Sequence, residues 1–347
     1  MYALRISEPI PLVDSRTSMM RIVRSFPHAQ QLRGRIPERN SPATKTQRIV
    51  SSRLATPCAP ATRCVILATH EGKGRSMIEQ SSFQINARAA MAYQDYNPLI
   101  MAPFVEAMIA RTAIAHGDTV LDLACGTGLV TRRAALLAGA EGRVVGLDLN
   151  PEMLAVARNL GAPSGASVAA IEWREGSALA LPCADGEFSV VLCQQGIQFF
   201  PDLQLATAEM ARVVAPGARL AVSFWAELGE QTYFQVQVAA LRRWLGAAVD
   251  PVAAAFRLDP LRVCDALTAA GFEDATAEQV VAKTSFPPME FYAAGQVMTL
   301  PVGPAFAALP EQERASYVEE VTRALRRYRV DGNYDCPVAS WLVTATR

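Results

Sequence analysis

The fold of this chain is decided by one stretch, Thr119-Val120-Leu121-Asp122-Leu123-Ala124-Cys125-Gly126-Thr127-Gly128. Its first half is a short apolar run, which predicts a buried strand that carries one acidic side chain, Asp122. Gly126 and Gly128 then break the run and let the backbone approach a ligand, because glycine has no Cβ. A helix is expected from Leu129 to about Ala138, and the amide groups at its start suit an anionic group of that ligand.

The same alternation of strands and helices continues along the chain. Strands and helices at this spacing form parallel βαβ units with right-handed crossovers. The sequence therefore predicts a doubly wound α/β sheet. The expected strands are 119–124, 143–148, 168–173, 188–193, 219–225, 277–284 and 338–346. The expected helices are 103–115, 129–138, 202–214, 234–245 and 260–270, with a helical stretch within 289–328. A further helix is expected to begin at Pro151 with Asn150 as its cap, and a turn is expected at 215–217.

The second expected strand ends in Asp148, 20 residues after Gly128. An acidic residue at this point can accept hydrogen bonds from both hydroxyls of a ribose. Both a nicotinamide dinucleotide and S-adenosylmethionine (SAM) carry such a ribose. The dinucleotide pattern of three glycines fails at Thr131, and Asp122 would repel a pyrophosphate. SAM suits Asp122 better, because it carries an ammonium group and a sulfonium.

Five segments together resemble the motifs of class I SAM-dependent methyltransferases. The first motif is matched by Val120–Gly128 and the second by Gly146-Leu147-Asp148-Leu149-Asn150-Pro151-Glu152-Met153-Leu154. Ala180–Phe188, Gln194–Pro201 and Val213–Gly217 complete the pattern. The similarity runs from about Tyr93 to Trp225, and it is greatest to the small-molecule enzymes of types 11 and 25, which include quinone-biosynthesis methyltransferases. This resemblance implies a Rossmann-like, seven-stranded, mostly parallel sheet with an antiparallel last strand and a small helical cap.

The resemblance also implies which residues hold SAM. It places the methionine portion on the turn after the first strand, the ribose on Asp148, and the sulfonium above Cys193 and Gln194. A tyrosine at the position of Tyr93 closes over the methionine end in the family. The residues expected at the methionine and adenine portions are Asp122, Ala124, Cys125, Gly126, Gly128, Leu149 and Met153.

One expected contact departs from the family pattern. Ser177 stands where the family usually has an aspartate that accepts a hydrogen bond from the adenine amino group. This departure either weakens the contact with adenine or leaves it to the backbone of Ala178. His116 is the only histidine after residue 76 and is expected at the surface. No catalytic base can therefore be named.

The function implied by the resemblance is methyl transfer from SAM to a small-molecule acceptor. The product would be S-adenosylhomocysteine, and the acceptor a quinone-like compound or a secondary metabolite, methylated on carbon or oxygen. Two other interpretations stay open. A nicotinamide-dependent oxidoreductase would share the Rossmann-like pattern, and a non-catalytic SAM-binding subunit would share the whole fold.

A cap over the cofactor is expected within residues 289–328. Three prolines divide this stretch into short pieces, and its apolar side chains are too many to leave in water. We expect the stretch to close over the sheet's carboxyl edge together with Tyr93 and Tyr96, and to enclose an apolar pocket beside Gln194–Phe199. A dimer interface is the alternative, so the chain is expected to be a monomer or a homodimer. The apolar residues concerned are Phe291, Tyr292, Met298, Leu300, Phe306 and Leu309.

Composition excludes several other functions. Hydrophobic residues make up 51% of the 347-residue chain, enough for a large core. Residues 1–76 contain 11 Arg and 2 Lys against 4 acidic residues, whereas the rest of the chain carries 20 basic and 29 acidic residues. An acidic main domain argues against a nucleic-acid partner. The seven cysteines lack the spacing of a metal site and indicate free thiols. No apolar run approaches the roughly 20 residues of a membrane span, so we expect a cytoplasmic protein.

The first 76 residues differ from the rest in composition. They are rich in Arg, Ser, Thr and Pro and show no sustained helix or strand period. A disordered extension, a transit peptide and a misassigned start are three interpretations of this segment. A start at Met77 is preferred, because Glu71–Arg75 would be encoded by purine-rich codons, like a bacterial ribosome-binding site. The methyltransferase domain is then 77–347, with the SAM-binding core at about 93–225 and the cap and last strands at 226–347.

Overall fold

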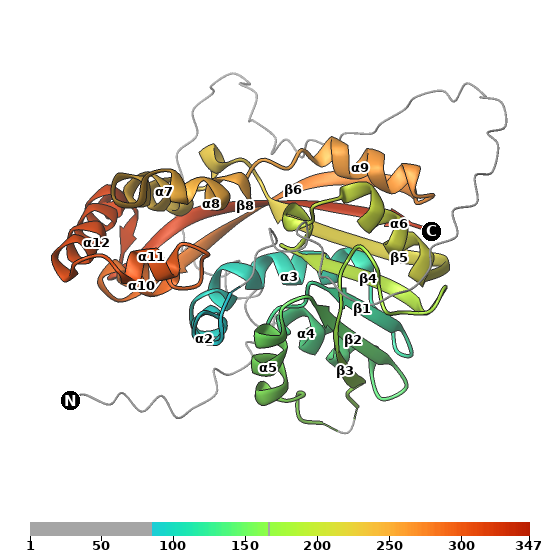
Figure 1. The fold of residues 1–347 in the computed structure, drawn as a ribbon. Helices are drawn as coiled ribbons and strands as arrows, with labels where there is room; N and C mark the ends of the chain where they lie inside the picture. The colour runs from blue at the N-terminus through green and yellow to red at the C-terminus, as the bar shows by residue number, and fades with distance from the viewer. Residues whose placement is uncertain (1–84, 166) are drawn as a thin grey trace, which may run out of the picture. The chain divides into compact units, whose positions relative to one another are not determined.

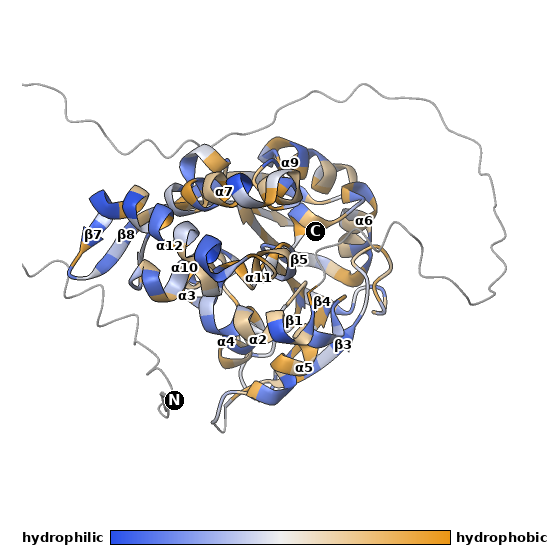
Figure 2. Ribbon diagram, turned by 60° about the vertical axis from the view of Figure 1, so that its left-hand side comes forward, coloured by the Kyte–Doolittle hydropathy of each residue, from blue (hydrophilic) through white to orange (hydrophobic). Residues whose placement is uncertain are grey.

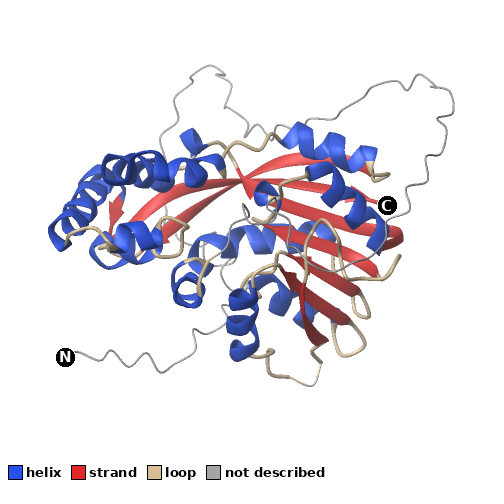
Figure 3. Cartoon of the chain, viewed as in Figure 1, coloured by secondary structure: helices blue, strands red, loops and turns tan. Residues whose placement is uncertain are grey.

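The computed structural model describes residues 85–165 and 167–347. They form one mixed sheet in the order β3-β2-β1-β4-β5-β8-β6 with helices on both faces (Figures 1 and 3). The interpretations of residues 1–76, including a start at Met77, lie outside the described residues. The strands are β1 Thr119–Leu123, β2 Arg143–Asp148, β3 Ala170–Glu175, β4 Phe188–Gln194, β5 Val214–Trp225, β6 Glu273–Phe286, β7 Arg329–Val330 and β8 Asn333–Thr346.

The helices follow the strands in the expected alternation. Figure 2 shows that they carry both hydrophilic and hydrophobic residues, as amphipathic helices on a sheet do. The α-helices are α2 Ala87–Tyr96, α3 Pro98–Thr112, α4 Leu129–Ala138, α5 Pro151–Leu160, α6 Leu203–Val213, α7 Thr232–Leu245, α8 Asp250–Ala254, α9 Pro260–Ala269, α10 Met289–Val297, α11 Gly303–Ala307 and α12 Glu311–Leu325. Short 3₁₀ turns are η2 Ile197–Phe199, η3 Leu228–Glu230, η4 Gly246–Val249 and η5 Arg326–Tyr328.

The direction of each strand agrees with the expected fold class. The strands β1 to β5 pair in parallel, whereas β8 runs antiparallel to both β5 and β6. The sheet is therefore mostly parallel with an antiparallel last strand, as in the Rossmann-like methyltransferases. The sheet has eight strands rather than seven, because the two-residue β7 turns back on β8. A run of two residues is too short for a strand to be predicted from the sequence.

Alternation along the central strands divides the core into two layers. Val190 and Leu192 of β4 pack on the face that α3 and α4 cover, and Val191 and Cys193 pack on the face that α6 and α9 cover. A side-chain period of two sends neighbouring residues to opposite faces, so a strand covered on both faces is apolar throughout. Because both faces are covered, the ligand can enter only at the sheet's edge.

Several expected bounds need correction. The helix expected from residue 103 begins at Pro98, which occupies its first turn, and it continues through Pro103. The third strand begins at Ala170 rather than 168, because the amide of Ala169 bonds to Ala135 of α4. The turn expected at 215–217 is a bulge inside β5, since Phe188 pairs with Val214 and Val190 with Arg219. The helix α5 begins as expected, with the side chain of its cap, Asn150, accepting from Glu152 N.

The last two long strands extend well beyond their expected bounds. Their pairing continues as far as Phe286 opposite Tyr334. Figure 1 shows these ends reaching out to α10–α12, which the chain forms between the two strands. A separate apolar cluster packs there, and it includes Tyr233, Phe286 and Tyr317. The cap thus has its own core, built on the ends of β6 and β8.

One partly buried carboxylate joins the amino-terminal ends of the central strands. Asp118 accepts hydrogen bonds from Ala115 N at 2.7 Å, from Ser189 Oγ at 2.8 Å and from Arg219 at 2.6 and 2.8 Å. Arg219 also donates to the carbonyls of Thr112 and Ala113 at the end of α3. Burial would raise the pKa of Asp118, but the hydrogen bonds it accepts outweigh this and hold its pKa below the ordinary value.

We predict that Asp118→Asn lowers the free energy of unfolding at pH 7 by about 1.5–3 kcal/mol, because it removes a charged acceptor from a half-buried network. A depressed pKa contributes stability that is present above the unfolded value and is lost as pH falls through the folded one. The difference between the wild type and this variant should therefore shrink in acid, as urea unfolding at several pH values will measure. Glu106→Gln breaks the exposed pair with Arg133 and should cost less than about 0.5 kcal/mol. Equal losses in the two variants would contradict the role of Asp118.

Candidate functional site

A large cavity lies at the carboxyl ends of β1, β2, β4 and β5. This is the edge at which the strand order reverses, between β1 and β4, and where doubly wound sheets bind ligands. Its empty volume is about 1390 Å³ with the open mouth included. Its polar end is lined by Asp148, Asn150, Ser177 and Gln194 and its apolar end by Ile100, Trp225, Phe234, Val252, Phe256 and Leu300.

The turn after β1 forms the floor of this cavity, and its backbone conformation depends on glycine. Gly126 has φ of +55°, and a Cβ built on it would meet nothing within 4 Å, so its backbone lies open to the cavity. Gly128 has φ of +83°, and a Cβ there would lie 2.3 Å from the ring of Trp173. The first glycine exposes the backbone to a ligand, and the second allows close packing of the turn on β3.

Asp148 ties this turn to the end of β2. Its Oδ2 accepts from Gly126 N at 2.7 Å, and its Oδ1 accepts from Asn150 N at 2.8 Å. Burial raises the pKa of Asp148, although these amide hydrogen bonds oppose the shift. Each carboxylate oxygen can accept more than one hydrogen bond, so this carboxylate can also accept from a ligand in the cavity.

A smaller recess adjoins the main cavity beneath the same turn. Asp122 lines it together with Cys125 and Thr127, and Tyr93 and Gln194 line both spaces. The carboxyl of Asp122 is 1% exposed and accepts from Thr131 Oγ1 at 2.5 Å. Burial, together with a smaller contribution from the charge of Asp148, raises its pKa to about 7, although the hydrogen bonds from Thr131 oppose the shift.

The charged side chains that line the two spaces are of one sign, whereas Arg132, whose charge lowers the pKa of Asp122, donates to Thr127 O and does not line them. Among the described residues, Asp122 and Asp148 line them, and no lysine, arginine or histidine does. Burial raises the pKa of Tyr93 to about 12, so its phenol is neutral. An anionic ligand such as a dinucleotide pyrophosphate would meet two carboxyls and no cation. A positively charged ligand would relieve the unfavourable burial of both carboxyls.

The structure brings most of the expected site residues to this cavity. Two of them do not reach it: Cys193 is fully buried beneath Gly196, and Gly128 packs on Trp173. His116 is exposed, as expected. The expected residues that line the main cavity or the recess are Tyr93, Asp122, Ala124, Cys125, Gly126, Asp148, Leu149, Met153, Ser177, Ala178 and Gln194.

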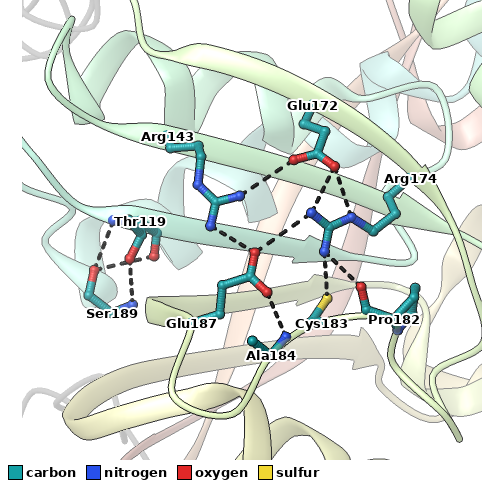
Figure 4. Close-up of polar contacts among 9 residues, drawn as sticks. All are labelled: Thr119, Arg143, Glu172, Arg174, Pro182, Cys183, Ala184, Glu187 and Ser189. Atoms are coloured by element: carbon teal, nitrogen blue, oxygen red, sulfur yellow. Dashed lines mark hydrogen bonds and ion pairs between the residues drawn. The ribbon is translucent and has the colours of Figure 1, made fainter.

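The loop that carries Ser177 is held in place by arginines. Ser177 Oγ accepts from Leu179 N at 3.2 Å, which fixes the start of the loop between β3 and β4. Figure 4 shows Arg174 donating to the carbonyl of Pro182 and contacting Cys183, beside the ion pairs of Arg143 with Glu172 and Glu187. This wall of the cavity is therefore anchored to β2 and β3.

The apolar end of the cavity was largely missed by sequence reasoning. The ring of Trp225 lies 5.1 Å from that of Phe234 and 6.1 Å from that of Phe256. Phe256 follows α8, a helix of five residues that no motif or period announces. These residues come from segments far apart in the chain, so only the folded structure brings them together.

The cap contributes Gln296 and Leu300 to the cavity wall. The expectation for Phe291 was wrong, because its side chain is 78% exposed and it is not among the residues that line the cavity. Phe306 is buried against Tyr317 in the core of the cap. Tyr96 supports the cap instead of lining the cavity, because its carbonyl accepts from Tyr292 Oη at 3.0 Å.

Across residues 85–165 and 167–347, every helix is too short or too polar to span a bilayer. Nowhere in the same residues do three His, Cys, Asp or Glu side chains gather as a metal site would require.

Comparison with known proteins identifies a family of methyltransferases. A family profile described as a methyltransferase domain matches residues 121–222. A 2-phytyl-1,4-naphthoquinone methyltransferase of Synechocystis is 32% identical over 185 residues, which are 52% of this chain and 75% of that protein. The enzyme of the same name from Thermosynechococcus vestitus is 36% identical over 172 residues, 46% of this chain and 74% of that protein. The solved structure of a Haemonchus contortus phosphoethanolamine N-methyltransferase with SAM is 16% identical, covers 76% of this chain and 57% of that chain, and has a TM-score of 0.47.

We predict that Asp122 titrates near pH 7 in the ligand-free protein, because burial favours its neutral form. Carbon-13 NMR of labelled aspartate carboxyls will show this titration, with Asp122→Asn identifying the signal. Thr131→Val removes a hydrogen bond to the carboxylate and should move the midpoint above 7. A midpoint near the ordinary value of about 4 would mean that water reaches the carboxyl.

Proposed function

Because the chain belongs to the class I SAM-dependent methyltransferases, we propose that it methylates an apolar, ring-bearing small molecule. The observation that carries this proposal is one continuous cavity with two unlike ends. The end beside Asp148 is polar and negatively charged, and the end beside Trp225 is apolar and aromatic. The first suits a cationic nucleoside, and the second suits a flat apolar ring.

The residues of the polar end fit SAM, and we propose a role for each. Asp148 would accept hydrogen bonds from the ribose hydroxyls, and Leu149 and Met153 would pack on the adenine. Ser177 and the backbone of Ala178 would face the adenine edge. The ammonium of the methionine portion would lie near Asp122, whose buried carboxyl has no cationic side chain lining the recess with it. Gly126 would let the backbone approach the same portion.

When bound, SAM supplies a methyl group on a sulfonium, which is already a good leaving group. The chain's residues then have to position the acceptor in line and exclude water. Tyr93 and Gln194 lie where the main cavity meets the recess, and Gln194 is fixed by its bond to Met101 O at 3.1 Å. These two side chains would hold the reacting groups between them.

The acceptor end offers no strong base among the described lining residues. An oxygen nucleophile usually needs a base, whereas an electron-rich ring carbon does not need one to attack. The new bond would join the methyl carbon to the ring as the methyl–sulfur bond breaks and leaves a thioether, and the ring would give up a proton to water. We therefore propose carbon methylation of a quinol-like ring, and the names of the two cyanobacterial relatives support this acceptor class.

An assay with methyl-tritiated SAM and 1,4-dihydroxynaphthalene tests this function. Label should pass into the naphthalene product, and one S-adenosylhomocysteine should form for each methyl transferred. A protein that binds SAM but transfers no label to this ring would contradict the proposed acceptor class.

We predict that Asp148→Asn weakens SAM binding about ten- to hundredfold, since a lost hydrogen bond to a charged acceptor costs about 1.5–3 kcal/mol. Titration calorimetry with SAM measures the affinity directly. Asp95→Asn removes an exposed charge from α2 and should leave the affinity unchanged. An Asp148→Asn variant with wild-type affinity would mean that the ribose is held elsewhere.

We predict that Leu300→Asn lowers kcat/KM for the ring acceptor by at least about tenfold while SAM affinity stays within twofold. The substitution places a polar group in the apolar wall, where it has no partner. Phe291→Asn is the matched control on the same cap, because Phe291 is exposed. If the two variants behave alike in the tritium assay, the cap does not hold the acceptor.

A further inference from the structure

Two buried glutamines lie in the otherwise apolar wall of the cap. Gln296 of α10 and Gln237 of α7 are each 1% exposed. Gln237 Nε2 donates to Tyr233 Oη at 3.1 Å and also to Gln296 Oε1. Burying an amide among aromatic rings is unfavourable unless its polar atoms are paired. The surrounding core could be filled by apolar side chains of the same size, so the pair needs a further explanation.

The bond from Gln237 orients the amide of Gln296. The Oε1 atom of Gln296 is engaged with Gln237, behind the cavity wall. Its Nε2 has no hydrogen-bond acceptor among the described residues, yet it is not enclosed in protein, and Gln296 lines the main cavity. The donor of Gln296 is therefore left for a group inside the cavity.

The backbone of Gln296 is held in place as well. Thr299 Oγ1 donates to the backbone carbonyl of Gln296 at 2.7 Å and accepts from Asn97 Nδ2 at 3.5 Å. Asn97 is 4% exposed, and its Oδ1 is enclosed in protein with no partner in the described structure, so this atom is closed to a ligand. The open donor of Gln296 is therefore fixed through both its side chain and its backbone.

We propose that Gln296 is the specificity-determining residue for a hydroxyl group on the acceptor ring. A hydroxyl oxygen accepts hydrogen bonds, so it can pair with Gln296 Nε2. Gln237 is a positioning residue that acts through Gln296. This inference rests on the proposed function for the nature of the ring and adds the group by which the ring is recognised.

The site discriminates against rings that lack the hydroxyl. A ring without it would leave Gln296 Nε2 unpaired and shielded from water. A site built to bond a hydroxyl rejects an analogue that lacks it far more strongly than an apolar pocket rejects a change in size. Gln296 therefore selects hydroxylated rings and also fixes which ring position faces SAM.

Binding of two probes tests the inference without requiring turnover. 1-Naphthol and 1-methylnaphthalene have nearly the same shape, and only the first has a hydroxyl. With SAM-saturated full-length protein, quenching of tryptophan fluorescence reports binding beside Trp225. We expect 1-naphthol to bind at least about tenfold more tightly than 1-methylnaphthalene.

Substitution by methionine removes each amide and keeps its length. Gln296→Met should bring the ratio of the two affinities close to one, and Gln237→Met should lower it by a smaller factor. Gln235→Met is the control on the same helix, because Gln235 is exposed, and it should keep the wild-type ratio. The double variant Gln237→Met/Gln296→Met leaves neither glutamine unpaired, so it should fold and bind SAM normally while losing the discrimination.

The results separate this inference from the proposed function. Equal affinities of the wild type for the two probes, no binding of either, or an unchanged ratio in the double variant would overturn the specificity site. A wild type that prefers 1-naphthol, but transfers no methyl group to 1,4-dihydroxynaphthalene, would retain the hydroxyl site and lose the proposed reaction.

Discussion

The rest of the site depends on the carboxylate of Asp148, which accepts from the amides of Gly126 and Asn150. These amides belong to the turns that follow β1 and β2, so one side chain fixes the distance between the two turns. Both turns line the cavity. If this carboxylate were lost, two buried N–H groups would need new partners, and the floor of the cavity would rearrange. The same group is thus a structural brace and, in the proposed function, the ribose acceptor.

The neighbouring carboxyl, Asp122, differs from Asp148 because its ionised form destabilises the free protein and would favour a cationic ligand. Its burial favours the neutral form, with a pKa of about 7, so ionising it at neutral pH works against the ligand-free fold. A cationic ligand in the recess would reverse this by favouring the carboxylate. The recess therefore stores an unfavourable interaction in the free protein that binding of a cation relieves. A neutral side chain in its place would suit the free protein and would lose this selectivity for a positive ligand.

The sequence predicts the cofactor half well because the signals there are local. A strand, two glycines and a helix within twenty residues fix the turn after β1, and Asn150 and Pro151 fix the start of α5. The acceptor half has no such signals. Phe234, Phe256 and Gln296 come from separate segments that line one cavity, and the length of the strands that carry the cap is set by the mutual register of β6 and β8 rather than by either sequence. The exposed position of Phe291 could not be foreseen for the same reason, since the face that α10 buries depends on α12 and α2.

This division of the chain has a physical consequence for specificity. The cofactor half is built on the sheet itself, where a change of register would move Asp122 and Asp148 together. The acceptor half is built on the ends of β6 and β8, and its core packs separately, around Tyr233 and Phe286. Side chains of the cap can therefore change without disturbing the floor of the cavity. In the proposed function, the methyl donor held by the sheet and the acceptor selected by the cap would meet near Tyr93 and Gln194, which are among the residues that line both spaces. Reaction geometry then depends on how the cap docks against α2, where Tyr292 bonds to the Tyr96 carbonyl and a Cβ on Gly295 would collide with the Tyr96 ring.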